Sequence, residues 1–190
     1  MSNDLWRPVA LVNPPPESDG GPIVSRLRTR RTIGVFTSAQ VIMGLVDPKG
    51  QRLSDFVNDR TSSYLVLYEA EVQDLLMGED ARPPVPELTV RKEVTELIVP
   101  QDTASGLRPQ VATRQLAIEL TTSFFRVRGD LHRRDTDPSN LAQLMSGFNR
   151  NFLPLTGATV EHLWRRDVQV SAAIVLVNAQ HLAAWAPVTA

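Results

Sequence analysis

The stretch Tyr64-Leu65-Val66-Leu67-Tyr68-Glu69-Ala70-Glu71-Val72 has a degenerate second copy in Phe152-Leu153-Pro154-Leu155-Thr156-Gly157-Ala158-Thr159-Val160, which starts 88 residues later. An aromatic residue, two leucines, an alanine and a valine keep their places in both copies. Both stretches are apolar runs of strand length, which predicts β-strands. A long-range match of this kind is typical of an internal duplication.

The residues that precede the two copies match as well. A short segment keeps its apolar positions at the same spacing of 88 residues: Leu53, Phe56 and Val57 correspond to Leu141, Leu144 and Met145. Their spacing of three to four residues predicts a short helix in each copy. Further upstream, Gly44 matches Gly129 at a spacing of 85 residues. The second copy therefore has about three extra residues in the intervening turn, as loops tolerate.

Two further matches extend the comparison toward the C-terminus. Arg91–Val94 aligns with Arg165–Val168 at a spacing of 74, and Ile98–Pro100 aligns with Leu176–Asn178 at a spacing of 78. Each change of spacing falls in a predicted loop. The sequence therefore predicts two copies of one unit, at residues 26–109 and 110–190.

Each unit is predicted to contain two strands, one short helix and three further strands (β-β-α-β-β-β). Four strands are located in the first unit, at 32–37, 40–46, 64–72 and 90–99, and five in the second, at 115–122, 123–131, 152–160, 168–177 and 181–186, with helices at 53–58 and 140–148. The protein is thus predicted to be mainly β, with each unit a small barrel or bent sheet. Gly44 and Gly129 are predicted at strand bulges, where a Cβ atom would clash.

Composition bounds the function. The chain has 190 residues, with 20 Lys and Arg against 21 Asp and Glu, and no cysteine. The absence of cysteine excludes disulfides and thiolate metal sites. No apolar run approaches the roughly 18 residues that span a bilayer, and residues 1–11 lack a signal-peptide core. We therefore expect a cytoplasmic protein without a membrane partner.

Residues 1–25 are predicted to be an arm outside the two units. Pro14-Pro15-Pro16 excludes a helix or central strand there. The arm is either disordered or docks on a partner, and Trp6 favours docking because tryptophan usually packs against other residues.

The predicted unit resembles the Sm-like small β-barrels, and in particular a group of uncharacterised bacterial Sm-like domains. The segments that carry the resemblance are Gly44-Leu45, Leu53-Ser54-Asp55-Phe56-Val57-Asn58, Tyr64-Leu65-Val66-Leu67, Phe152-Leu153-Pro154-Leu155 and Val177-Asn178. The resemblance covers about residues 28–190 in two copies. It implies assembly through edge strands, often into rings, and frequently RNA binding.

The RNA-binding Sm pattern has an Asp-x-apolar-Asn loop between early strands and an Arg-Gly near the end of the barrel. Here the early turn is Asp47-Pro48-Lys49-Gly50, and the last strand runs Val177-Asn178-Ala179-Gln180-His181. The resemblance therefore implies assembly more strongly than RNA binding, and a tandem chain would supply two positions of a ring.

Residues that could carry catalysis do not form a recognisable constellation. The acidic pairs Asp135/Asp137 and Glu79/Asp80 lie in predicted turns beside arginines, which favours solvated loops over acid–base catalysis. The three histidines lack metal-ligand spacing, and no nucleophile elbow or phosphate loop is present. The sequence thus predicts a protein that is not an enzyme, with no catalytic residue, metal or cofactor.

Arginines gather in the predicted strands and bends, where they could form contact surfaces. Because Arg26, Arg28 and Arg30 alternate, they are predicted to share one strand face. The full predicted contact surface is Trp6, Arg26, Arg28, Arg30, Arg126, Arg128, Arg133, Arg134 and His181.

The main expectation is a non-enzymatic assembly or scaffold protein that associates through edge strands with itself, as a homo-oligomer, or with a protein partner. The alternative is a module that binds nucleic acid or nucleotides. It would use the face of Arg126, Arg128, Arg133 and Arg134 for phosphate contacts.

Overall fold

A computed structural model describes residues 30–75, 82–101, 114–138, 140–147 and 151–188. The predicted arm, with Trp6, and the residues Arg26, Arg28, Glu79 and Asp80 lie outside these ranges.

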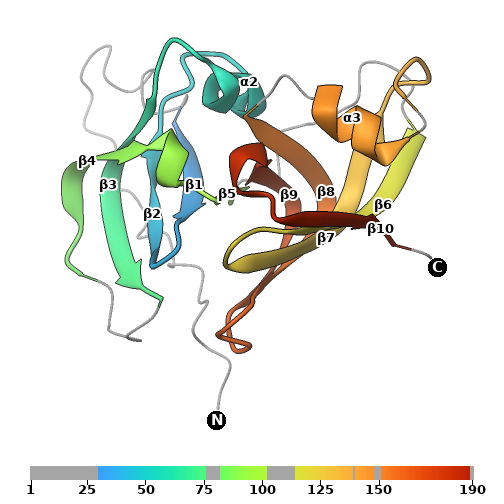
Figure 1. Ribbon diagram of the computed structural model, residues 1–190. Helices are drawn as coiled ribbons and strands as arrows, with labels where there is room; N and C mark the ends of the chain where they lie inside the picture. Colours follow the sequence, from blue (N-terminus) through green and yellow to red (C-terminus); the bar gives the residue numbers. More distant parts are fainter. Residues whose placement is uncertain (1–29, 76–81, 102–113, 139, 148–150, 189–190) are drawn as a thin grey trace.

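The described chain is mainly β with two short helices, as predicted (Figure 1). The first half contains β1 (Arg31–Phe36), β2 (Gln40–Val46), α2 (Leu53–Asn58), β3 (Tyr64–Asp74), β4 (Val85–Arg91), the 3₁₀ turn η2 (Lys92–Val94) and β5 (Leu97–Pro100). The second half contains β6 (Arg114–Thr121), β7 (Phe125–Arg133), α3 (Leu141–Gly147), β8 (Phe152–His162), β9 (Gln169–Asn178), the 3₁₀ turn η3 (Ala179–His181) and β10 (Ala184–Pro187).

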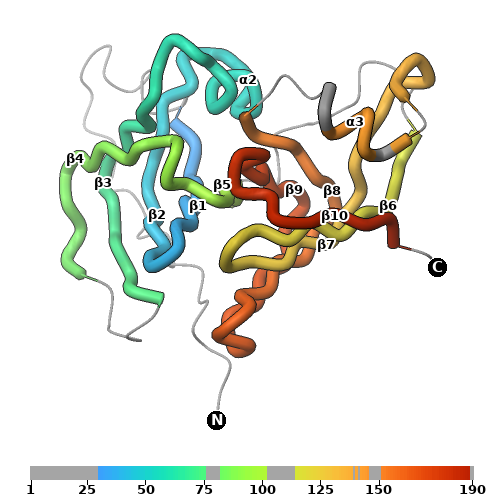
Figure 2. The backbone as a smooth tube through the Cα atoms, viewed as in Figure 1, coloured from blue at the N-terminus to red at the C-terminus, as the bar shows by residue number. Residues whose placement is uncertain are grey.

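All ten described strands belong to one antiparallel sheet, in the order β10-β6-β7-β8-β9-β5-β1-β2-β3-β4. The first half has the order β5-β1-β2-β3-β4, and the second half has the same order with corresponding strands, β10-β6-β7-β8-β9. The two halves lie side by side, with β5 and β9 at their boundary and both helices at the same end of the molecule (Figures 1 and 2). The sheet thus continues across the predicted boundary between the units, and its two edges are β4 and β10.

The strand registers also repeat. Ile33 of β1 lies opposite Gly44, and Ile118 of β6 lies opposite Gly129. The register to the next strand shifts at both glycines, so the predicted bulges are confirmed. A Cβ atom on Gly129 would lie 3.0 Å from the carbonyl oxygen of Thr156, which explains the requirement for glycine.

The C-terminal part of the sequence alignment is wrong. Leu176 and Val177 lie in β9, whose counterpart is β4, so they do not correspond to Ile98 and Val99 of β5. The predicted strand 90–99 is in fact divided, since η2 separates β4 from β5. The correct spacing follows from the register: Tyr64 pairs with Arg91 as Phe152 pairs with Asn178, a shift of 87 residues between β4 and β9.

The hydrophobic core forms two clusters, and each cluster draws side chains from both halves. The second-half residues Phe152 and Leu176 are buried in the cluster of Ile33, Val35 and Leu65. Conversely, the first-half residues Phe36, Leu97 and Val99 are buried with Leu120 and Phe125 in the other cluster. Full burial of a phenylalanine or leucine side chain contributes about 1.5–3 kcal/mol, so this exchange binds the halves together.

None of the helices in the described ranges is long and apolar enough to cross a membrane.

Candidate functional site: the junction between the halves

The junction is built on the pairing of β5 with β9. Leu97 lies opposite Val177 and Ile98 opposite Leu176. The backbone amide of Asn178 donates to the carbonyl of Glu96 at 2.8 Å and continues the pairing beyond the strand. The second half thus adds its edge to the first half by β-augmentation.

A buried asparagine holds the turn between β4 and β5. The Asn178 side chain donates through Nδ2 to the carbonyls of Lys92, at 3.1 Å, and Thr95, at 2.8 Å. Its Oδ1 accepts from the backbone amide of Gln180 at 3.0 Å. A single side chain, that of Asn178, therefore holds both η2 of the first half and η3 of its own half.

Asn58 makes a reciprocal contact from the end of α2. Its Oδ1 accepts from the backbone amide of Phe152 at 2.8 Å, and its Nδ2 donates to the Phe152 carbonyl at 3.1 Å. Both backbone groups of the first residue of β8 are thereby satisfied by the other half, which positions the Phe152 ring in the first-half cluster.

Glu96 is a buried acid in the same junction. Its Oε2 accepts from the Thr122 hydroxyl at 2.5 Å and from the Phe124 amide at 3.4 Å. On the surface, Nε2 of His181 lies 2.6 Å from the carbonyl of Glu93. The buried Glu96 carboxylate thus finds its hydrogen-bond donors in the other half, as a buried polar group requires.

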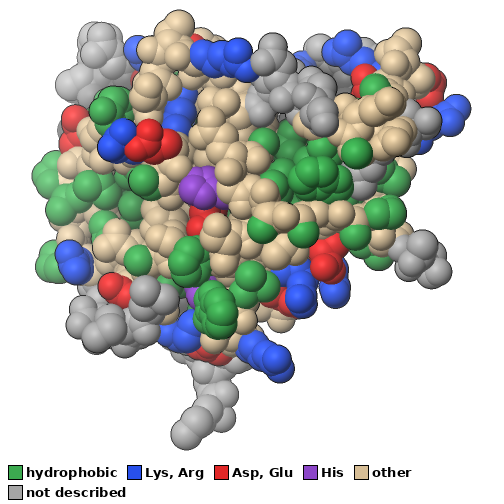
Figure 3. Space-filling view, viewed as in Figure 1, with side chains coloured by type: hydrophobic (Ala, Val, Ile, Leu, Met, Phe, Trp, Pro, Cys, Tyr) green, Lys and Arg blue, Asp and Glu red, His purple; other side chains and the backbone are tan. Residues whose placement is uncertain are grey.

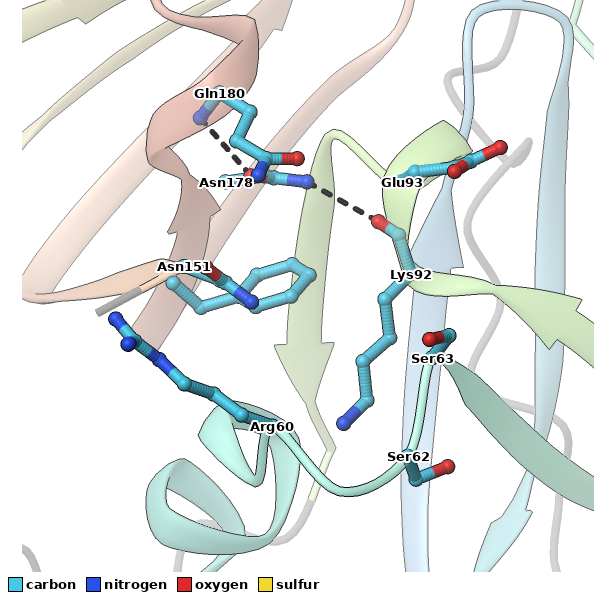
Figure 4. Close-up of a pocket in the computed structure, with 9 residues that line it drawn as sticks. Arg60, Ser62, Ser63, Lys92, Glu93, Asn151, Asn178 and Gln180 are labelled. Carbon is cyan, nitrogen blue, oxygen red and sulfur yellow. Dashed lines mark hydrogen bonds between the residues drawn. The ribbon is translucent and has the colours of Figure 1, made fainter. Parts of the chain in front are cut away.

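A cavity of about 250 Å³ opens at this junction. Its lining is mostly polar and comes from both halves: Arg60, Ser62, Ser63, Lys92, Glu93, Asn151, Phe152, Asn178 and Gln180. In Figure 4, Lys92 extends toward the segment that carries Arg60 and Ser62, whereas the Glu93 side chain points to the opposite side. The lining therefore presents two cations where the acidic side chain is turned away.

Lys92 is a buried cation in the cavity wall. Its Nζ donates to the carbonyl of Asp59 at 2.8 Å. Burial lowers the pKa of Lys92, and the nearby Asp59 carboxylate opposes that change. Hydrogen bonds from the amide and hydroxyl of Thr61 lower the pKa of Asp59, so this carboxylate stays charged beside the lysine.

The predicted arginine surface is divided along β7. Arg126 and Arg128 lie near its beginning, where Glu119 accepts from Nε of Arg128 at 2.6 Å and contacts Arg126 at 3.5 Å. Glu161 lies 3.7 Å from Arg126 on its other side. These carboxylates reduce the positive potential on which the nucleic-acid alternative depends, and that alternative stays a prediction.

Arg133 and Arg134 lie at the opposite end of β7 and do not join Arg126 and Arg128. Arg133 donates to the carbonyl of Pro138 at 3.3 Å, and the backbone amide of Arg134 donates to Asp137 at 2.6 Å. Asp137 is therefore part of a turn, as the sequence indicates.

Arg30 lies over the Tyr68 ring at 4.4 Å and 3.9 Å from Glu69. Tyr68 and Glu69 belong to β3, which β2 separates from β1, so Arg30, immediately before β1, contacts a strand beyond its direct neighbour.

The sequence interpretation missed His162 as a buried group. Its Nδ1 accepts from the amides of Trp164 and Arg165, at 3.2 and 3.0 Å, and its ring packs edge to face with Phe125. Burial, together with the charge of Arg165, lowers its pKa. Within the described ranges no group of three or more His, Cys, Asp or Glu residues is placed to hold a metal ion.

Counterparts of the junction residues lie on or beside the two edge strands of the described sheet, and these counterparts are exposed. Phe152 is fully buried at the junction, and its counterpart Tyr64 at the start of β3 is 48% exposed. Ile98, opposite Val35, is fully buried, and its counterpart Trp185, opposite Leu120, is 41% exposed.

Figure 3 shows hydrophobic side chains gathered between α3 and β10, and a second group along β4. The region between α3 and β10 corresponds to the place that Phe152 and Leu176 occupy in the first half. Within the described residues, no strand pairs with β10 on the side away from β6, so the second half lacks the pairing that β9 gives the first half.

Comparison with known proteins adds no relative: no family model, no curated protein and no solved structure matches the chain.

Proposed function

We propose that this protein is a non-enzymatic assembly protein, built from two Sm-like β units, whose chains associate head to tail through β4 and β10. The supporting observation is that, among the described strands, β4 and β10 each pair with one neighbour only, and that exposed counterparts of residues buried at the β5–β9 junction lie on or beside them. The proposed contact repeats between chains the pairing that already exists within one chain.

The repeat specifies the register of this contact. Because Leu97 lies opposite Val177 and Ile98 opposite Leu176, their counterparts place Ala184 opposite Val90 and Trp185 opposite Thr89. Pro86 falls outside these two paired positions, so its missing amide donor does not interrupt them.

The proposed contact also covers exposed apolar surface. Tyr64 of one chain would enter the region between α3 and β10 of the next chain, as Phe152 enters the first-half cluster. Two different edges meet in this contact, so it is heterologous and leads to a ring if the rotation between chains closes.

The contact between chains is expected to be weaker than the junction within a chain. The position of Asn178 is taken by Arg91 at the free edge, and the position of Asn58 is taken by Ser146. The buried amide contacts of the internal junction are thus not repeated, and we expect assembly to depend on concentration.

Light scattering after size exclusion tests the proposal. The wild-type chain is expected to exceed the mass of one chain and to approach it on dilution. Trp185→Glu is expected to give single chains, because it puts a charge where Ile98 is buried in the internal junction. The matched control is Trp164→Glu, since Trp164 is 75% exposed in the β8–β9 turn, away from both edges. A wild-type chain that stays single at high concentration would refute the proposal.

A second change tests the register itself. Residues directly opposite in an antiparallel pair have Cβ atoms about 5 Å apart, close enough for an ion pair. Combining Trp185→Glu with Thr89→Lys is therefore expected to restore part of the mass that Trp185→Glu removes. Lysine at the non-opposing exposed position Glu87 is the control and is expected to restore less.

A further inference from the structure

We propose that the cavity at the junction binds a small oxyanion, a phosphate group carried as free phosphate or as a phosphomonoester, with Lys92 and Arg60 as its cationic ligands. The two cations lie in the wall of one cavity of about 250 Å³, which is ample for a phosphate group. Both halves of a single chain form this cavity, so the inference does not depend on assembly between chains.

The Lys92 ammonium in the cavity wall lowers the stability of the folded protein when no anion is bound. Lys92 is buried, and its ammonium carries three donors while one bond, to the Asp59 carbonyl, is formed within the described residues. Burial of an ammonium is unfavourable unless it is paired, and the lowered pKa of Lys92 reflects this cost. The nearby Asp59 carboxylate offsets part of this cost, and an oxyanion in the cavity would supply acceptors for the two remaining N–H donors of Lys92.

The acidic groups near the cavity are already engaged. Glu93 is ion-paired with Arg91, and its side chain points away from Lys92 in Figure 4. Asp59 accepts from the amide and hydroxyl of Thr61. Both carboxylates thus have ion-pair or hydrogen-bond partners other than Lys92.

Neutral donors complete the lining. Asn151 and Gln180 carry side-chain amides that make no hydrogen bond among the described residues, and Ser63 carries a hydroxyl in the same condition. Asn151 lies between Arg60 and Asn178 in Figure 4. An arginine fork, an ammonium and neutral N–H and O–H donors form the donor set that phosphate oxygens accept from.

The chain offers an internal control for the test, because it contains two lysines, Lys49 and Lys92. Lys49 is exposed in the turn after β2. Protein labelled with ¹³C at the lysine ε-carbon should therefore give two resonances, which Lys92→Met assigns. Inorganic phosphate is expected to shift the Lys92 resonance saturably and to raise its pKa, with little effect on Lys49.

Glycerol 3-phosphate distinguishes a phosphomonoester from free phosphate, with glycerol and matched ionic strength in chloride as controls. Arg60→Gln is expected to weaken phosphate binding by about tenfold, as for loss of one charge-assisted contact. The control Arg52→Gln changes an exposed arginine before α2 and should leave binding unchanged. An unmoved Lys92 resonance, equal shifts of both lysines, or an equal response to chloride would overturn the inference.

The outcome is separable from that of the assembly proposal. The same titration on Trp185→Glu is expected to give the same phosphate response, because Trp185 does not line the cavity. Failure of assembly would thus leave phosphate binding to be judged on its own result.

Discussion

The Asn178 side chain bonds three backbone groups, two of which, the carbonyls of Lys92 and Thr95, belong to the other half. Sequence alone places Asn178 in the closing segment of the second unit, but its partners at Lys92 and Thr95 are more than 80 residues away. Only the pairing of β5 with β9 brings them together. The contacts of such a residue therefore cannot be predicted from the sequence alone.

Asn178→Ala is expected to lower the free energy of unfolding by about 1–3 kcal/mol, since it leaves buried carbonyls without a donor. Urea unfolding followed by circular dichroism measures this change. Asn151→Ala is the matched control, because the Asn151 side chain makes no hydrogen bond within the described ranges and its loss should cost little. Equal losses in the two variants would contradict the proposed role of Asn178.

His162 should make stability depend on pH. Its folded pKa lies below that of the unfolded chain, about 6.5, because it is buried and near Arg165. Between these two values the unfolded chain binds more protons, so the free energy of unfolding falls as the pH falls below about 6.5. Above that pH the contribution is fully present.

His162→Asn tests this dependence, because the asparagine carbonyl can replace Nδ1 as acceptor for the Trp164 and Arg165 amides. Urea unfolding from about pH 7.5 to about pH 5 should show a smaller loss of stability in the variant. Parallel curves for the two proteins would assign the pH dependence to other groups.

At the scale of elements, local pattern predicts both helices and most strands. Leu53, Phe56 and Val57 place α2 correctly, because a short amphipathic segment needs no distant information. The single strand predicted at 90–99 is wrong because the break within it depends on a distant contact. Thr95 and Glu96 carry no turn signal, and the 3₁₀ turn before them is held by Asn178 from the other half.

The misaligned repeat has a physical origin as well. Leu176-Val177 and Ile98-Val99 resemble each other because both are central strands buried on both faces, and they lie next to each other in the sheet. Similar environments select similar residues. The sequence match therefore paired two strands that are neighbours in the sheet, not two strands that occupy the same position in the two halves. The cavity residues were missed for a related reason, because Lys92 and Arg60 belong to turns that only the tertiary fold brings together.

For the whole molecule, the shared core predicts that the halves fold together. Phe152 and Leu176 complete the first-half cluster, and Phe36 and Leu97 complete the other. Fragments cut between residues 101 and 114 are therefore expected to be largely unfolded alone and to regain β structure when mixed. Circular dichroism and amide exchange measure this, and two fragments that each fold stably would contradict the prediction.

The fact that β5 and β9 belong to one chain has a further consequence. Their encounter within one chain is intramolecular, so its effective concentration is set by the connecting segment and does not fall on dilution. In the proposed assembly, β5–β9 junctions within chains would alternate with β4–β10 contacts between chains. Only the contacts between chains would separate on dilution. Dilution would then release whole chains in which the β5–β9 junction is intact. Every species in solution would contain an even number of halves, because each chain contributes two.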